Sequence, residues 1–542
     1  MQPEKHATRR PFAVYLFFAL YLAAGLLSFK GYGVSTDETI NRQNGLVTAK
    51  YLIKKAGIPG FENNPAFRNI FDLHTYVDKD YGVVFELPLV LLERVVGIED
   101  NNSAELWYLR HLCTFLVFYL GVIYFYQLVK LRFGSRSLAL LGCFFLVVSP
   151  RIFAESFYNG KDVIFLAFFI IATYYLVRFL RQKTVPNAVL LGLSAAVATD
   201  TRILGILIPC VAIFFTGLDA LHLDRDKTQL RQRLVALAAF LAAFAGFVVL
   251  FWPYLWEDPA GNFVQAFRNM SKFRWNNEVL YRGEHIAASQ IPWHYVPVWL
   301  TITTPLLYTG LFGAGTVLIA ARAFSRLPRL YATDAERDDL VFAGLFFGPL
   351  LAVIVMHSVL YDGWRQMYFL YGSFLLVALR GLHALREALR TRAGRPAVAT
   401  AAVAGLAVLL LTPTLYWMVK NHPYQHVYFN ALAGRNIETR FERDYWGLSY
   451  RQALDYIFRT DGRSNLLISA NLSKPAKSNL NLMDKQHQAR VAMLDKEDIL
   501  PAERAHYYVT EYRYRRTKPI PGREVFNVRV DGFKIIAVYK IR

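Results

Sequence analysis

The sequence predicts an α-helical polytopic membrane protein with about eleven transmembrane helices and a small C-terminal α/β domain outside the membrane. Three observations support this fold class. Of the 542 residues, 54% are hydrophobic and only 19% are charged, whereas an ordinary soluble domain carries about 25% charged residues. The apolar residues gather in long runs, many able to cross a hydrocarbon core of about 30 Å. After Tyr416 these runs end, and the remaining chain holds 22 basic and 13 acidic residues.

The first apolar run, Pro11–Phe29, follows Lys5, Arg9 and Arg10. Because basic residues accumulate on the cytoplasmic side of membrane spans, the N-terminus is expected in the cytoplasm. The run exceeds the apolar core of a cleavable signal, about 7–15 residues, and no clear A-x-A site follows it. We therefore expect a retained first span.

Ten further apolar runs predict the remaining spans: Leu106–Leu131, Leu138–Phe153, Val163–Leu180, Ala188–Ala198, Ile203–Leu221, Leu234–Trp252, Val298–Ala320, Leu340–His357, Met367–Leu379 and Ala397–Tyr416. The alternation puts the C-terminus outside and makes five basic loops cytoplasmic, with Arg132 and Arg136, Arg181 and Lys183, Arg225 to Arg233, Arg322 to Arg329, and Arg386 to Arg395. The formal charge of +20 thus reflects topology rather than nucleic-acid binding. The alternation fails if the short run Ala188–Ala198 does not cross, and the runs around Asp200 could instead form one broken helix.

Two long segments, residues 30–105 and 253–297, then face outward from a transmembrane domain of residues 1–416. The first contains Tyr81–Gly97, which is too charged to span the membrane and predicts a helix lying in the interface. The second is dense in aromatic residues, which form either an interfacial belt or a cover over a lipid-substrate site.

Residues 417–542 are expected to form the outer domain. Its predicted elements are a helix around Ser449–Phe458 and strands at Asn465–Ala470, Ala489–Leu494, His506–Tyr512 and Val525–Tyr539, the last a hairpin turning at Asp531-Gly532.

Several catalytic motifs are absent from the sequence. It has no HExxH, CxxC, Walker A or GxSxG pattern, so nucleotide-driven transport and zinc proteolysis lose their usual marks. His422 and His426 lie four residues apart, but Pro423 between them argues against a helical metal-binding pair. Cys113, Cys143 and Cys210 lie in apolar runs and are expected to be small buried hydrophobes.

Polar residues at the outer ends of spans are the candidate functional groups, because an ionisable group near lipid is costly and is retained mainly at a site or pathway. Ser35–Glu38 contains the carboxylate pair Asp37 and Glu38, which could divide the roles of base and ligand. The same four residues also fit a helix capping box. In the next segment Lys161 could bind hydroxyl or phosphate groups, and Asp162 either joins it or simply begins the following helix.

Two arginines follow on the same side. Arg202, between two apolar runs, either snorkels to the interface or binds phosphate with its guanidinium fork. Arg365 follows the turn predicted at Asp362-Gly363, so it is either a phosphate ligand next to Tyr361 or a structural partner of Asp362. Outer carboxylates and arginines together suit a transferase with a lipid-linked phosphate donor, in which a carboxylate takes a proton from an acceptor hydroxyl and cations stabilise the departing phosphate.

These residues stand in motifs with a family resemblance. The Asp37-Glu38 pair, YNGKD ending at Asp162, TDTR ending at Arg202, YDGWRQMYF around Arg365 and the stretch from His422 to Ala453 resemble the glycosyltransferase-C superfamily. The resemblance is to bacterial polyprenyl-phosphate-sugar transferases related to protein O-mannosyltransferases and to the lipid A aminoarabinose transferase. The motifs extend over most of the chain.

The resemblance implies a helix bundle with interfacial helices in the first outer loop and an outward site that a lipid carrier reaches through a lateral groove. Asp37 would be the catalytic base of an inverting transfer. The substrate-binding residues would be Glu38 and Asp162 for sugar or acceptor groups, Arg202 and Arg365 for the carrier phosphate, and Lys161 and Tyr361 beside them. Many relatives have His where this chain has Gln366, which removes one possible cation.

The partners implied are a polyprenyl-phosphate-linked sugar, a lipid, glycan or protein acceptor, and membrane lipids, with no nucleic acid. The carboxylate pair could also hold a divalent cation. The expected location is the cell (inner) membrane, with the active site outside the cytoplasm. A lipid or sugar transporter is the alternative, but it predicts charges at mid-membrane and inverted half-sequences, whereas these spans are apolar at their centres. A scaffold or receptor leaves the aligned outer charges unexplained.

Overall fold

The computed structural model describes residues 12–58, 68–222, 227–271, 275–393, 396–494, 505–513, 520 and 522–542. Lys5, Arg9, Arg10, Pro11, Arg225 and Arg395, which enter the topology prediction, lie outside these residues.

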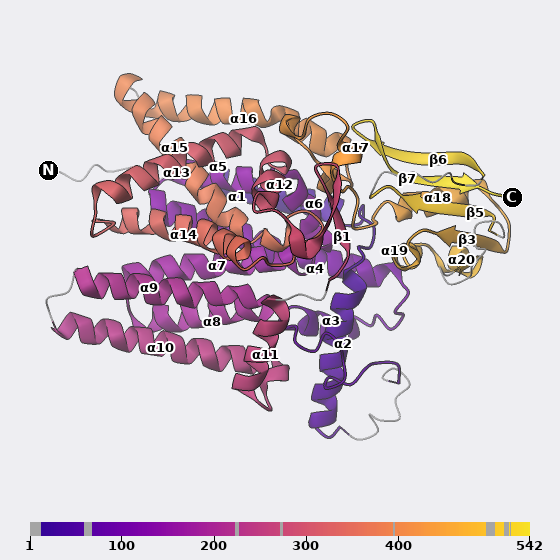
Figure 1. Ribbon diagram of the computed structural model, residues 1–542, viewed down its shortest axis with the longest axis horizontal. Coiled ribbons are helices and arrows are strands. Elements are labelled where there is room, and N and C mark those ends of the chain that lie inside the picture. Colours follow the sequence, from indigo (N-terminus) through magenta and orange to yellow (C-terminus); the bar gives the residue numbers. More distant parts are fainter. Residues whose placement is uncertain are drawn as a thin grey trace.

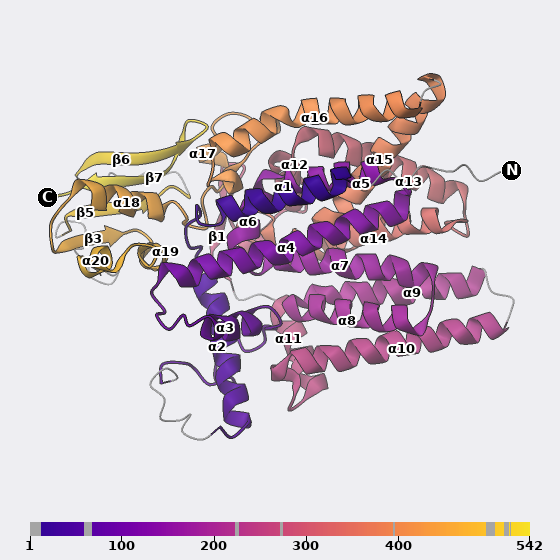
Figure 2. The ribbon, with the colours of Figure 1, turned by 180° about the vertical axis from the view of Figure 1, so that it is seen from behind.

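Long helices lying side by side form the body of the molecule (Figures 1 and 2). They are α1 (Phe12–Ser28), α4 (Ala104–Phe133), α7 (Asp162–Arg181), α8 (Val185–Thr201), α9 (Leu207–His222), α10 (Lys227–Phe251), α13 (Leu306–Ser325), α14 (Asp334–Val355), α15 (Leu370–Ala393) and α16 (Pro396–Lys420). Helices α5 (Arg136–Val147) and α6 (Pro150–Tyr158) form a pair bent by 70°. Within the described residues, seven helices are long and apolar enough to cross a membrane, or eight if the bent pair is one span.

The chain is therefore a multi-pass membrane protein. Each of the expected apolar runs contains a helix, although α1 is only 17 residues long and α8 and α15 are not among the seven, so the number of about eleven spans stays a prediction. The runs around Asp200 do not form one broken helix. Arg202 has an extended backbone, and after the short helix η3 (Ile203–Ile206) the chain returns along the bundle as α9.

The C-terminal segment forms a mixed sheet at one end of the bundle (Figure 1). The strands are β3 (Leu466–Ala470), β4 (Val491–Leu494), β5 (Tyr507–Glu511), β6 (Arg523–Val530) and β7 (Phe533–Lys540), in the order β4-β3-β5-β7-β6. Strand β3 runs parallel to β4 and β5, and β7 runs antiparallel to β5 and β6. The β6–β7 turn contains Asp531 and Gly532 with positive φ values of 48° and 85°, as the Asp-Gly pair predicts.

Helices of the C-terminal segment cover this sheet and connect it to the bundle. They are α17 (Ile437–Arg440), α18 (Tyr450–Thr460), α19 (Ser473–Leu480) and α20 (Lys485–Ala489), preceded by the short helices η7 (Gln425–Val427) and η8 (Ala431–Ala433). The apolar face of α18, with Leu454 and Ile457, packs in one buried cluster with Ile468 of β3 and Val538 of β7.

The two long loops expected to face outward, called the first and second outer loops, lie at the end of the bundle that carries the sheet (Figure 1). In the first, α2 (Glu38–Lys55) runs across the direction of the bundle in both views, and α3 (Glu86–Val95) falls within the expected interfacial helix. Buried ion pairs of Glu93 with Arg42 (2.9 Å) and Arg110 (2.6 Å) join α2, α3 and α4. The second loop contains η4 (Pro253–Leu255), α11 (Pro259–Ser271), the hairpin β1 (Glu278–Tyr281) and β2 (Glu284–Ala287), η5 (Ala288–Gln290) and the start of α12 (Tyr295–Thr303).

The opposite end of the bundle contains buried carboxylates that the sequence analysis did not single out. Asp219, Asp338 and Asp339 pair with Lys183 (2.6 Å), Arg181 (2.5 Å) and Arg132 (2.6 Å), respectively. Part of the basic charge assigned to the cytoplasmic loops therefore neutralises buried aspartates.

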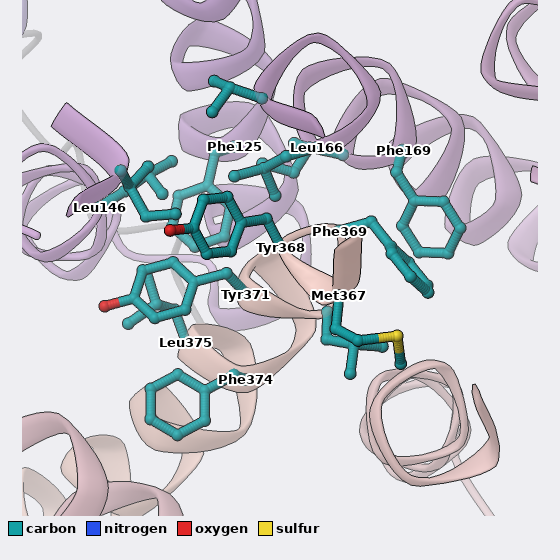
Figure 3. Close-up of a cluster of buried hydrophobic side chains, with 14 of the residues drawn as sticks. Phe125, Leu146, Leu166, Phe169, Met367, Tyr368, Phe369, Tyr371, Phe374 and Leu375 are labelled. Carbon is teal, nitrogen blue, oxygen red and sulfur yellow. The ribbon is translucent and has the colours of Figure 1, made fainter. Parts of the chain in front are cut away.

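A core of aromatic and aliphatic side chains holds the start of α15 in place (Figure 3). Met367, Tyr368, Phe369, Tyr371, Phe374 and Leu375 belong to the same buried cluster as Phe125, Leu146, Leu166 and Phe169 from α4, α5 and α7. This packing fixes the short helix η6 (Arg365–Met367) immediately before it.

Candidate active site

A cavity of about 270 Å³ lies at the end of the bundle that carries the sheet. Its polar part is lined by Asp37, Lys161, Arg202, Tyr361 and Arg365, together with Asp78 and Asp80 of the first outer loop. Its apolar part continues between the start of α9 and the end of α14, along Leu204, Leu207, Ala352, Val353 and Met356. Ala352 and Met356, which line it one turn apart at the end of α14, are both exposed, so the apolar part opens to the surface beside α14.

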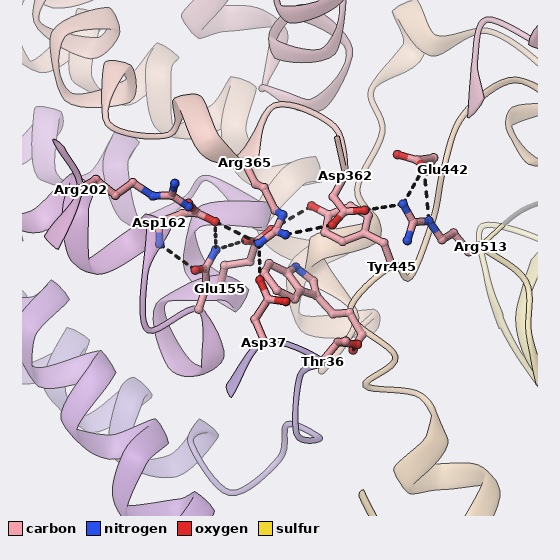
Figure 4. A network of polar contacts seen from close by, with 12 residues as sticks. Thr36, Asp37, Glu155, Asp162, Arg202, Asp362, Arg365, Glu442, Tyr445 and Arg513 are labelled. Carbon is pink, nitrogen blue, oxygen red and sulfur yellow. Dashed lines mark hydrogen bonds and ion pairs between the residues drawn. The ribbon is translucent and has the colours of Figure 1, made fainter. Parts of the chain in front are cut away.

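Arg365 is the centre of the polar part (Figure 4). Its Nη1 donates to Asp37 Oδ2 (2.7 Å) and Asp162 Oδ2 (3.3 Å), and its Nη2 pairs with Asp362 Oδ2 (3.0 Å). The guanidinium also lies 4.6 Å from the ring centre of Trp446. A buried cation is tolerated only when paired, and three carboxylates meet that requirement here.

The turn before Arg365 aims its side chain. Asp362 and Gly363 both have left-handed backbones, with φ values of 57° and 70°, which Gly adopts freely and Asp more readily than most residues. The Asp-Gly turn and the Asp362–Arg365 ion pair, both offered by the sequence as alternatives to a phosphate site, are present. They place the same guanidinium against Asp37.

Asp37 is the accessible carboxylate of this network. Its side chain is 30% exposed and lines the cavity, whereas that of Asp162 is 1% exposed. Burial alone would raise the pKa of Asp37, but the Arg365 guanidinium, reinforced by Lys161 and Arg202, holds that pKa below its usual value. Asp37 is therefore ionised at neutral pH and able to accept a hydrogen bond or a proton.

Asp162 begins α7 and does not line the cavity. One of its oxygens contacts Arg202, and the other accepts from Arg365 and from Asn159 Nδ2 (3.1 Å). Because both oxygens are engaged, Asp162 orients two arginines instead of offering a free oxygen to a sugar. Arg202, which the sequence analysis allowed to snorkel, points inward and lines the cavity.

Lys161 and Tyr361 contribute further groups to the cavity. Lys161 Nζ lies 2.9 Å from the ring centre of Tyr81, and no carboxylate of the described residues forms an ion pair with it. Burial, together with the charge of Arg202, lowers the pKa of Lys161 to about 7. Tyr361 stacks on Trp275 of the second outer loop, with ring centres 4.4 Å apart.

Comparison with known proteins identifies the fold that holds these residues. Residues 103–252 match the model of the dolichyl-phosphate-mannose-protein mannosyltransferase family. The crystal structure of ArnT from Cupriavidus metallidurans bound to undecaprenyl phosphate is similar, with a TM-score of 0.50 and 12% identity over 98% of each chain. The chain has the glycosyltransferase-C fold.

Other solved structures are also similar to the chain. The apo state of the same ArnT gives a TM-score of 0.50 and 12% identity over 97% of each chain. An oligosaccharyltransferase of Archaeoglobus fulgidus, in complex with Zn and sulfate, gives a TM-score of 0.45 and 11% identity over 91% of this chain and 68% of that chain. No curated protein sequence matches the chain. The similarity to the two ArnT structures confirms, at the level of fold, the resemblance to the glycosyltransferase-C superfamily that the motifs suggested.

Glu38 does not belong to the cavity of this glycosyltransferase-C fold. One of its oxygens accepts from the backbone N–H of Ser35 (2.6 Å), and the other lies 3.0 Å from His111 Nε2. Glu38 therefore makes the capping interaction that the sequence allowed, and Asp37 does not. The structure gives no support for a contact between Glu38 and the substrate. The two carboxylates thus face different partners in the structure.

The histidines considered as metal ligands have other partners. Gln425 Nε2 lies 3.1 Å from His422 Nδ1, and Asp444 Oδ1 lies 2.9 Å from His426 Nε2. Among the residues that the structure describes, no group of three His, Cys, Asp or Glu side chains is arranged to hold a metal ion.

Part of the second outer loop covers the cavity. Trp252, Phe267 and Met270 line it, while Trp256 and Trp293 are exposed. Some aromatic residues of this region therefore line the cavity, and others are exposed, as the residues of an interfacial belt would be.

Several residues at or beside the cavity were not predicted as site residues. Trp446 and Glu442 lie in the motif that begins at His422, whereas Arg513 carries no sequence signal at all. Gln366 lines the cavity, and within the described part of the chain neither polar atom of its amide has a hydrogen-bond partner. Asp200 accepts the backbone N–H of Val84 (2.7 Å) and so fastens the first outer loop to α8.

Proposed function

We propose that the protein is a membrane glycosyltransferase that moves a monosaccharide from a polyprenyl-phosphate carrier to an acceptor hydroxyl on the outer face of the cell (inner) membrane. The carrying observation is the two-part cavity, in which buried cations meet an apolar channel that opens to the surface beside α14. A phosphate needs the first part and a prenyl chain needs the second. The glycosyltransferase-C fold and the mannosyltransferase-family match support a lipid-linked donor.

Three cations would hold the carrier phosphate. Arg202 and Arg365 present guanidinium groups, whose planar forks match phosphate oxygens, and Lys161 adds an ammonium group without a carboxylate partner among the described residues. The similar ArnT structure was solved with undecaprenyl phosphate, which makes the same carrier class the first candidate.

Asp37 would act as the general base. As its carboxylate removes the proton from the acceptor hydroxyl, the acceptor oxygen forms a bond to the anomeric carbon of the sugar. The bond between that carbon and the phosphate oxygen breaks at the same time, and its electron pair stays on the phosphate. The cations stabilise this charge. A single displacement inverts the anomeric carbon, and the protonated Asp37 returns its proton to water.

The first prediction concerns Asp37. Mass spectrometry of glycans and lipids from cells with and without the gene should reveal one glycosylated product that depends on it. Asp37→Asn should abolish that product, a loss of at least about 100-fold as for a positioned general base, while the protein remains in the membrane and binds undecaprenyl phosphate.

Asp100→Asn is the matched control, because Asp100 lies in the same outer loop, is exposed and pairs with Lys485. It should leave the product unchanged. Full activity of Asp37→Asn would contradict the proposal, and carrier binding with no gene-dependent product would favour a transporter.

A further inference from the structure

Arg513 connects the C-terminal sheet to the active site (Figure 4). It lies just beyond Tyr512, the residue that follows β5, and its Nη2 donates to Asp362 Oδ1 (2.5 Å) and to Glu442 Oε1 (2.9 Å). Its side chain is 16% exposed. The arginine thus reaches from the C-terminal segment into the turn that carries Arg365.

Asp362 is shared between two arginines. Arg513 takes its Oδ1 and Arg365 takes its Oδ2 at 3.0 Å. Arg365 in turn divides its guanidinium between Asp362 on one side and Asp37 with Asp162 on the other. The position of Arg365 therefore depends on how much of the Asp362 charge is neutralised by another group.

We propose that Arg513 is a positioning residue of the active site, which neutralises Asp362 and so leaves Arg365 available to Asp37 and to the donor phosphate. The proposal rests on the proposed function and assigns the C-terminal segment a part in it. Without Arg513, the buried Asp362 would draw the Arg365 guanidinium towards itself and make the cluster more negative. Both effects weaken the binding of an anion.

The environment of Asp362 agrees with this role. Burial raises the pKa of Asp362 to about 6, and Arg513 is the strongest of the groups that oppose this rise, ahead of Arg365. Arg513 thus helps to keep the Asp362 carboxylate charged beside Arg365.

The contacts that hold the backbone of Arg513 do not involve its guanidinium group. Its backbone N–H donates to the Glu511 carboxylate, and its carbonyl accepts from the N–H of Arg443 (3.3 Å). These contacts remain when the side chain is exchanged. A substitution of Arg513 therefore tests the guanidinium rather than the attachment of the strand.

The test is a double-mutant cycle on the dissociation constant for undecaprenyl phosphate, measured with the full-length protein in lipid nanodiscs. Arg513→Gln should weaken binding about tenfold, within the range of coupling between residues that share a network. Arg513→Lys should recover part of the affinity, because it restores the charge but not the guanidinium geometry. In the Asp362→Asn background, Arg513→Gln should change the affinity less than twofold, since the carboxylate that Arg513 shares with Arg365 has lost its charge.

Arg443→Gln is the matched control. Arg443 belongs to the same segment, and its guanidinium donates to the carbonyl oxygens of Lys534 and Glu438, away from Asp362. It should lower the melting temperature without changing the dissociation constant. If Arg513→Gln does not accumulate, Arg513→Lys alone decides: it should bind more weakly than wild type by twofold to fivefold, because an ammonium group cannot reproduce the guanidinium geometry.

Three results would overturn the proposal: unchanged affinity in Arg513→Gln, an equal loss in Arg443→Gln, or a loss that persists in full in the Asp362→Asn background. Failure of the wild-type protein to bind undecaprenyl phosphate would instead refute the proposed function, and this inference with it.

Discussion

At the scale of single residues, the site is a set of alternating charges in which both arginines are paired with carboxylates. Arg365 contacts Asp37, Asp162 and Asp362, and Asp162 also holds Arg202. Sharing keeps buried charges paired while the cavity is empty of substrate. A phosphate that enters the cavity competes with these carboxylates for the same donors. The arginines therefore do not have to be buried unpaired before the anion binds.

Lys161 provides a prediction on pH. Its pKa of about 7 means that the ammonium group is charged below that pH and loses its charge as the pH rises. Lys161→Arg keeps the charge at every pH tested. The ratio of undecaprenyl-phosphate affinity, wild type over Lys161→Arg, should therefore fall as the pH rises from 6 to 8, and titration of the phosphate itself cancels in the ratio. Binding titrations across this range check it, and a constant ratio would contradict a phosphate contact of Lys161.

The sequence predicts which residues gather at much of this site, but not which interaction each of them makes there. One cavity is lined by all of the residues Asp37, Lys161, Arg202, Tyr361 and Arg365. Polar residues at the ends of spans are costly in lipid and therefore gather at such a site. Glu38 does not line this cavity, since adjacent residues at a helix start point in different directions. The roles of Asp162 and Glu38 depend on partners that lie far away in the sequence.

At the scale of elements, the apolar part of the cavity depends on the packing of α9 and α14. Ala352 lines it from α14, and Leu204 and Leu207 line it from the opposite side. A small residue at position 352 leaves space that a prenyl chain could occupy. Neither helix reveals this from its own sequence, because both read as ordinary apolar spans.

Filling this space gives a second test. Ala352→Trp should reduce the affinity for undecaprenyl phosphate at least about tenfold, because the indole occupies the volume of several methylene groups, each worth about 0.8 kcal/mol when buried. A short-chain prenyl phosphate should lose less. Leu351→Trp is the control, since Leu351 lies one residue away, is 58% exposed and does not line the cavity. Equal losses in the two variants would argue against the channel.

Secondary structure at this scale was well predicted where local signals are strong. The outer strands and their Asp-Gly turn match the expected segments, and α3 falls within the expected interfacial helix. The bend between α5 and α6 was not expected, because Leu138–Phe153 reads as one apolar run although Pro150 interrupts it.

At the scale of the whole molecule, charge divides between two ends. One end pairs buried aspartates of the bundle with loop cations, and the other holds the cavity, both outer loops and the C-terminal sheet. The placement of basic loops predicted which polar groups share an end. It could not predict that Arg513 would meet Asp362, because a contact between residues 151 positions apart leaves no local pattern.

The central claim is that one cavity binds the phosphate and the prenyl chain of the carrier together. Cryo-electron microscopy of the protein in lipid nanodiscs with saturating undecaprenyl phosphate tests it directly. We predict phosphate density within about 3 Å of donors on Arg202, Lys161 and Arg365, with the chain leaving between α9 and α14 past Ala352. The claim would be contradicted by carrier density at another face of the bundle, with the three cations still in contact with their present partners.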